Sequence, residues 1–152
     1  APLAISDADG LRLSGMSHID RTADSKNARQ IVQLRRLDSL IEDFPRLAAV
    51  KLIKCDVEGY ELFVFRGATE ILERSRPFVI LEIGHFELHG YSAVDVFDFF
   101  STRNYEAFAM IDERTLARTD RTLEHKNALS VNRLMIPTEQ LSILAGRIQI
   151  VE

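Results

Sequence analysis

Several residue types are scarce in this sequence, and each shortage excludes a class of protein. With a single cysteine, Cys55, the chain forms no intrachain disulfide, so nothing indicates an oxidising compartment. No apolar run approaches the roughly 20 residues of a membrane-spanning helix. The N-terminus also lacks the cationic and apolar segments of a secretory signal. We therefore expect a cytoplasmic protein without a membrane partner.

Positive charge is in short supply as well. Lysine and arginine number 19 against 23 aspartates and glutamates, for a formal net charge of −4. A protein whose main partner is a nucleic acid needs a basic surface to neutralise phosphates, so we expect no nucleic-acid partner. The 152 residues are about one domain long, and a hydrophobic content of 46% is ordinary for a packed core. The sequence predicts one domain over residues 1–152.

The most informative segment is residues 50–67, VKLIKCDVEGYELFVFRG. A buried strand predicted over 48–55 ends at Asp56 and Glu58, and an amphipathic helix predicted over 60–65 follows Gly59. Ligands of open α/β sheets bind beyond the carboxyl ends of parallel strands. A second predicted strand, 78–83, ends with Glu82, which would then lie on the same rim as Asp56. This edge of the sheet is the predicted site.

The rest of the chain alternates strands and helices in the manner of an α/β sheet. Asp38 is predicted to cap a helix over 39–44, and Asn104 to take a left-handed conformation at a helix end. The last two predicted strands have no helix between them, so we expect them to pair antiparallel. The further predicted elements are a helix over 93–100, a strand over 105–111, a polar loop over 112–127, a final strand over 128–136 and a helix over 138–145.

Three pieces of sequence stand in a characteristic order: Leu37-Asp38, the run from Ile53 to Glu61, and Leu81-Glu82. Together they resemble the FkbM family of S-adenosylmethionine-dependent methyltransferases, over roughly residues 1–137. The resemblance implies a Rossmann-like class I methyltransferase sheet in an α/β fold, mostly parallel with a reversed final strand. It also implies transfer of a methyl group from S-adenosylmethionine to a hydroxyl of a small-molecule acceptor.

One feature of such enzymes is missing. Methyltransferases of this class hold the cofactor with a glycine-rich turn after the first strand, but no two of the seven glycines here form a G-x-G. The resemblance places Ser6 and Asp7 where the third strand approaches the cofactor. We therefore expect a partial domain that lacks the first two strands and binds S-adenosylmethionine weakly or not at all. An exposed sheet edge would then allow a homodimer.

Roles for the candidate residues follow from the motif and the resemblance. Asp56 and Glu58 are the catalytic candidates, with Asp56 as general base toward a hydroxyl. Each also has a structural explanation: Asp56 could cap the following helix, and Glu58 could interact with the dipole of that helix. Glu82 and His85 are candidates for substrate binding, and we expect no metal site. Two alternatives remain: a non-catalytic half-domain that binds a partner, and a metal-dependent hydrolase that uses Asp56, Glu58 and Glu82.

Four other side chains near the site are predicted to have structural rather than functional roles. Lys54 is predicted to pair with a carboxylate on the sheet surface, and Glu61 to interact with the helix dipole. His89, which stands four residues after His85, is predicted to be solvated in its loop. Cys55 is predicted to pack under a helix, without the histidine partner that a nucleophile needs.

Overall fold

The computed structural model describes residues 2–4, 18–19, 30–31 and 33–152. Its strands are β1 (Pro2–Ala4), β2 (His18–Ile19), β3 (Gln30–Ile31), β4 (Leu52–Cys55), β5 (Phe78–Glu82), β6 (Tyr105–Met110), β7 (Thr115–Arg118), β8 (Asn132–Pro137) and β9 (Gln149–Val151). Its α-helices are α1 (Glu61–Arg66), α2 (Thr69–Ser75) and α3 (Ala93–Ser101). Its 3₁₀ helices are η1 (Asp38–Leu40), η2 (Pro45–Ala49), η3 (Phe86–His89) and η4 (Thr138–Leu144). None of the described helices is long and apolar enough to cross a membrane.

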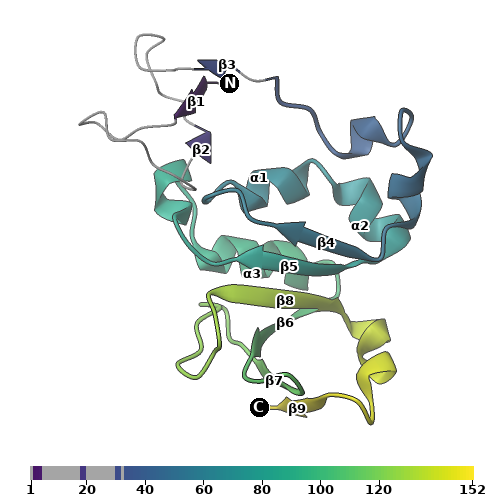
Figure 1. Ribbon diagram of the computed structural model, residues 1–152, viewed down its shortest axis with the longest axis vertical. Coiled ribbons are helices and arrows are strands. Elements are labelled where there is room, and N and C mark those ends of the chain that lie inside the picture. The colour runs from purple at the N-terminus through teal and green to yellow at the C-terminus, as the bar shows by residue number, and fades with distance from the viewer. Residues whose placement is uncertain (1, 5–17, 20–29, 32) are drawn as a thin grey trace.

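The strands form two sheets (Figure 1). A small antiparallel sheet has the order β2-β1-β3, and the main sheet has the order β4-β5-β8-β6-β7-β9. Strands β4 and β5 are parallel, and β8 runs antiparallel to both of its neighbours, β5 and β6. Strands β4, β5 and β6 therefore share one direction, and β8 is the reversed strand that was predicted.

The main sheet is nevertheless mixed, and the expectation of a mostly parallel sheet is wrong. Strand β7 pairs antiparallel with β6, and β9 pairs parallel with β7, so three of the six strands run against β4. The difference arises after residue 111. There a hairpin strand, β7, and a last strand, β9, extend the sheet where the sequence analysis predicted a polar loop and no further strand.

Apolar side chains cover both faces of the sheet. Neighbours on β8 belong to different clusters: Met135 packs with residues of α1 to α3, such as Phe65 and Phe100, whereas Ile136 packs with Phe108 of β6. Successive side chains of a strand point to opposite faces, so the two clusters lie on opposite sides of the sheet. The α-helices cover one face. Partly buried apolar residues of η4 cover part of the other.

Segment 38–55 differs from the prediction. In place of a helix over 39–44, the chain forms the short η1 followed by a turn, and residues 45–49, which begin with a proline, form η2. Strand β4 therefore begins at Leu52. The Asp38 carboxylate does cap a helix, but that helix is α2: its oxygens accept hydrogen bonds from the backbone N–H groups of Glu70 and Ile71 at 3.2 and 3.1 Å.

The left-handed conformation predicted for Asn104 is confirmed: its φ is 58°, and it lies directly before β6. Ser92 and Asp95, for which nothing was predicted, form a reciprocal capping box at the start of α3, which stabilises the beginning of this helix. Strand β5 alternates between buried and half-buried residues, as expected for a strand in the interior of a sheet.

Candidate functional site

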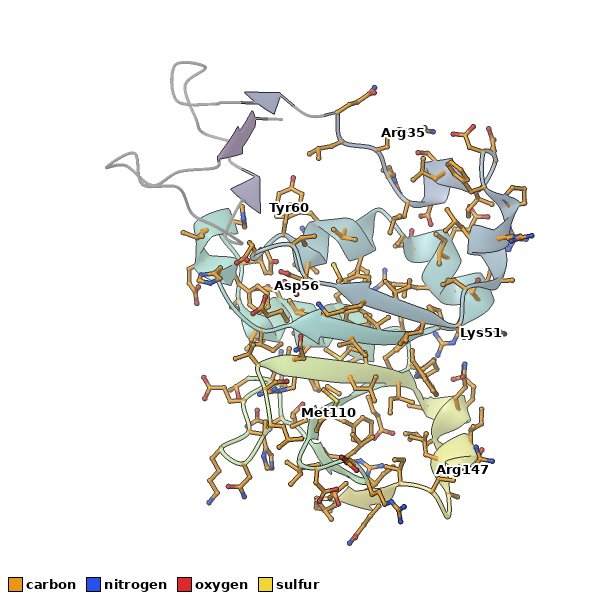
Figure 2. All side chains as sticks on the ribbon, viewed as in Figure 1. Arg35, Lys51, Asp56, Tyr60, Met110 and Arg147 are labelled. Atoms are coloured by element: carbon orange, nitrogen blue, oxygen red, sulfur yellow. The ribbon has the colours of Figure 1, made fainter. Side chains whose placement is uncertain are left out.

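The parallel pairing of β4 and β5 brings three carboxylates to one edge of the sheet. Asp56 follows the last residue of β4, and Glu82 is the last residue of β5. Because Cys55 lies opposite Leu81 in the register, Asp56 and Glu82 emerge side by side. One carboxylate oxygen from each of Asp56, Glu58 and Glu82 lies within 4.8 Å of the others. Figure 2 labels Asp56 at this end of β4.

Left-handed backbone conformations shape the two loops at this edge. Glu58, Gly59 and His85 have φ angles of 53°, 86° and 56°, and for Glu58 and His85 such angles are uncommon. A Cβ atom added to Gly59 would lie 2.3 Å from the backbone oxygen of His85, so only glycine allows this approach. The loop after β4 is therefore pressed against the loop after β5. His85 Nε2 lies 3.8 Å from Glu58 Oε2, which joins the fourth predicted site residue to the other three.

Lys54 places a positive charge beside the carboxylate cluster. Its Nζ donates to Asp56 Oδ2 at 2.5 Å, and this confirms the predicted pairing of Lys54 with a carboxylate. Hydrogen bonding from Lys54, with a further contribution from Glu82, lowers the pKa of Asp56 below its ordinary value. Partial burial and the neighbouring Asp56 raise the pKa of Glu82. The two carboxyl groups are thus unlike: Asp56 is ionised at neutral pH, and Glu82 retains a proton more readily.

Glu61 was predicted to interact with the helix dipole, but the structure places its side chain in the core. Its side chain is fully buried, and Oε1 accepts a hydrogen bond from the backbone N–H of Val57 at 2.9 Å. Within the described part of the chain, Oε2 has no hydrogen-bond partner. Burial is the main cause that raises the pKa of Glu61, and the charge of Asp56 adds to it. Glu61 therefore stabilises the loop between Asp56 and Glu58 by a hydrogen bond from the core side.

Tyr91 is a supporting residue that sequence reasoning missed. Its hydroxyl donates to the backbone oxygen of Gly59 at 2.6 Å and accepts from the N–H of Leu62 at 3.3 Å. Its ring stacks on Phe86 with centroids 5.1 Å apart. The tyrosine therefore links the loop after β5 to the left-handed turn after β4. No pattern in the sequence marks it, because the contact joins residues about thirty positions apart.

Cys55 and His89 are not part of the carboxylate cluster. Cys55 is buried in the core, as predicted, and burial raises its pKa to about 12, which keeps the thiol protonated at neutral pH. His89 is not simply solvated: its ring meets the ring of Tyr60 edge-on at 5.1 Å. Ser6 and Asp7, the predicted cofactor contacts, lie outside the residues that the structure describes.

Comparison with known proteins yields one match. The family model described as the methyltransferase FkbM domain matches residues 1–107, which include the whole carboxylate cluster and extend into β6. No curated protein and no solved structure matches the chain in the same comparisons.

Proposed function

Since the chain belongs to the FkbM methyltransferase domain family, we propose that it takes part in transfer of a methyl group from S-adenosylmethionine to a hydroxyl of a small molecule. The observation that carries this proposal is the exposed carboxylate of Asp56 at the carboxyl edge of β4, where the hydrogen bond from Lys54 lowers its pKa. Ligands of α/β sheets bind at such edges. An ionised carboxylate there is suited to accept a hydrogen bond, and then a proton, from an acceptor hydroxyl.

The pKa of Asp56 is lowered and that of Glu82 is raised, so the two groups have different roles in the proposed reaction. Asp56 orients the acceptor hydroxyl and receives its proton as the acceptor oxygen gains the methyl group. Glu82, which retains a proton more readily, donates a hydrogen bond to the neighbouring carboxyl or to the acceptor. Lys54 holds Asp56 in place from the side of the sheet. Glu58 and His85 border the acceptor position from the two loops and supply further polar contacts.

S-adenosylmethionine, when bound, supplies a methyl group activated by the positively charged sulfur. The residues described here form a site for the acceptor rather than a cradle for this cofactor, because the sequence contains no G-x-G turn. Ser6 and Asp7 remain the proposed cofactor contacts. We expect the 152-residue chain to bind S-adenosylmethionine weakly or not at all, which calorimetry on the purified chain measures. Low-micromolar affinity would contradict this expectation.

Two variants test the proposed role of Asp56. At S-adenosylmethionine concentrations high enough to offset weak binding, Asp56→Asn should lower kcat by about 10²–10⁴-fold, the usual contribution of a general base. The assay follows transfer of a labelled methyl group from the cofactor to hydroxylated small molecules. Affinity for the cofactor should change little. Glu113→Gln, an exposed acid on another loop, is the control. Turnover that is unchanged in Asp56→Asn, together with a lower Tm, would reduce Asp56 to a structural residue.

The second candidate function is a non-catalytic half-domain that binds a partner, and the missing glycine-rich turn favours it. Methyl transfer by the purified chain would exclude this candidate. Absence of transfer, with a folded chain that binds no cofactor, would support it. A metal-dependent hydrolase is separated from both by a simple comparison, because its turnover would require a divalent metal and no methyl donor.

A further inference from the structure

We propose that Asp56, Glu58 and Glu82 bind a divalent cation at the carboxyl edge of β4 and β5, although the sequence analysis predicted no metal site. Each residue offers a carboxylate oxygen, and these oxygens all lie within 4.8 Å of one another. Hard divalent cations such as Ca²⁺ and Mg²⁺ take carboxylate oxygens as their preferred ligands in proteins. The cluster in the described residues includes neither His85 nor His89.

A separate observation, the buried carboxyl group of Glu61, also favours a cation at this edge of the sheet. Glu61 is fully buried, and its Oε2 has no hydrogen-bond partner among the described residues. The side chain turns back toward the loop of the cluster, because Oε1 accepts from the N–H of Val57, the residue between Asp56 and Glu58. A buried carboxyl group that lacks a partner is costly, and a cation bound above this loop would offset the cost.

Few positive charges accompany the three carboxyl groups of the cluster in the described part of the chain. Asp56 and Glu58 lie in the loop after β4, and Glu82 is the last residue of β5. In the described part of the chain, the ion pairs made by these groups are Lys54 with Asp56 and His85 with Glu58, and the second requires a protonated histidine. A divalent cation would supply the charge that these partners do not.

The irregular composition of the site favours Ca²⁺ over Mg²⁺. Two ligands of one ion lie at most twice the metal–oxygen distance apart, which is about 5.2 Å for Ca²⁺, and all the oxygens of the cluster lie within 4.8 Å of one another. Mg²⁺ demands near-ideal octahedral geometry and gives up its water ligands reluctantly, whereas Ca²⁺ tolerates flexible geometry. We therefore expect Ca²⁺ to bind more tightly than Mg²⁺.

Isothermal calorimetry of the purified chain with CaCl₂ and with MgCl₂ tests the proposal and needs no methyl donor. We expect one saturable site for Ca²⁺ with a dissociation constant of about 10⁻⁴–10⁻³ M, the range of exposed sites with few charged ligands. Asp56→Asn and Glu82→Gln should each weaken binding at least about tenfold, because each removes a charged ligand. Glu61→Gln, which keeps the shape of the side chain, should weaken it by a smaller factor.

Two matched variants sharpen the test. Lys54→Gln should bind Ca²⁺ more tightly than the original chain, because the Lys54 ammonium competes with the ion for Asp56. Glu113→Gln, which changes an exposed acid between β6 and β7 that is not part of the cluster, should bind as the original does. Absence of a saturable site at millimolar Ca²⁺ would overturn the proposal. So would equal affinities in the original chain, Asp56→Asn and Glu82→Gln, or a Lys54→Gln variant that binds no more tightly.

Failure here is distinguishable from failure of the proposed function. Cation binding is measured without methyl donor or acceptor, so a negative result leaves the role of Asp56 as a base intact. Conversely, a chain that binds Ca²⁺ and transfers no methyl group would support the cation site alone. If both activities are found, the cation lies where it would lower the pKa of an acceptor hydroxyl.

Discussion

Removing the Asp38 carboxylate should destabilise a helix that begins about thirty residues away in the sequence. The N-cap position of α2 is Ala68, whose side chain cannot cap, and the Asp38 carboxylate takes over this role. It accepts from the N–H groups of Glu70 and Ile71 at 3.2 and 3.1 Å and from the Thr69 hydroxyl at 3.3 Å. Asp38→Ala therefore leaves two N–H groups of the first helical turn without this acceptor.

The expected cost has two parts. Loss of a capping side chain costs about 0.5–2 kcal/mol, and loss of a negative charge at a helix N-terminus costs about 0.3–1 kcal/mol. Because the Asp38 side chain is only 12% exposed, water replaces these contacts poorly, and we expect a total of about 1.5–2.5 kcal/mol. For a chain of this size that is a decrease in Tm of about 3–10 °C.

Thermal unfolding followed by circular dichroism measures the effect, and hydrogen exchange locates it. In Asp38→Ala the amides of Glu70 and Ile71 should exchange faster. Asp43→Ala is the matched control: it removes an exposed acid of the same segment, which forms an ion pair with Arg35, and should change Tm by about 1 °C or less. Equal Tm values for the two variants would refute the capping role. Faster exchange confined to residues 41–44 would instead favour a local cap.

Three more predictions concern other parts of the chain. Gly59→Ala should lower the free energy of unfolding by at least about 1–3 kcal/mol, because the added Cβ would clash with the His85 carbonyl. Gly84→Ala is the control, since a Cβ added there has no atom within 4 Å and causes no such clash. Denaturant unfolding measures the stability of both variants. Glu139→Gln should lower Tm at pH 7, since the Arg76 guanidinium lowers the pKa of Glu139 and stabilises its ionised form in the folded chain. The difference in Tm between this variant and the original chain should vanish as the pH falls below about 4, where Glu139 becomes protonated. A difference that stays constant with pH would refute this. Finally, β4 pairs only with β5 among the described strands, so we predict dimers in light scattering at micromolar concentration, and a monodisperse monomer would contradict this.

The sequence was most informative about the elements near the site. The apolar runs that stop at acidic residues, in VKLIKCDVEG and FVILE, were enough to predict two strands that end in carboxylates, and the structure places these carboxylates together. Asparagine also indicated a local boundary correctly, because Asn104 takes the positive φ that was predicted for it. Such features depend on residues close in sequence.

What could not be predicted depends on contacts between distant residues. Asp38 looked like the cap of its own helix, because a sequence shows only its neighbours and not Ala68 and α2 beside it. The short strand β7 was hidden among polar residues, and its pairing with β6 is what makes it a strand. Glu61 looked like an ordinary first-turn residue until the structure placed it in the core.

The central place of β8 has a consequence for how the chain folds. This strand lies near the end of the sequence, yet it separates β5 from β6 in the main sheet (Figure 1). Before residues 132–137 have left the ribosome, β4 and β5 on one side and β6 and β7 on the other have no strand to join them. Pairings that wait for a distant segment are slow to form and leave strand edges exposed in the meantime. The main sheet is thus completed only after β8 is synthesised, and a chain cut short before Asn132 would be left with two unjoined pairs of strands.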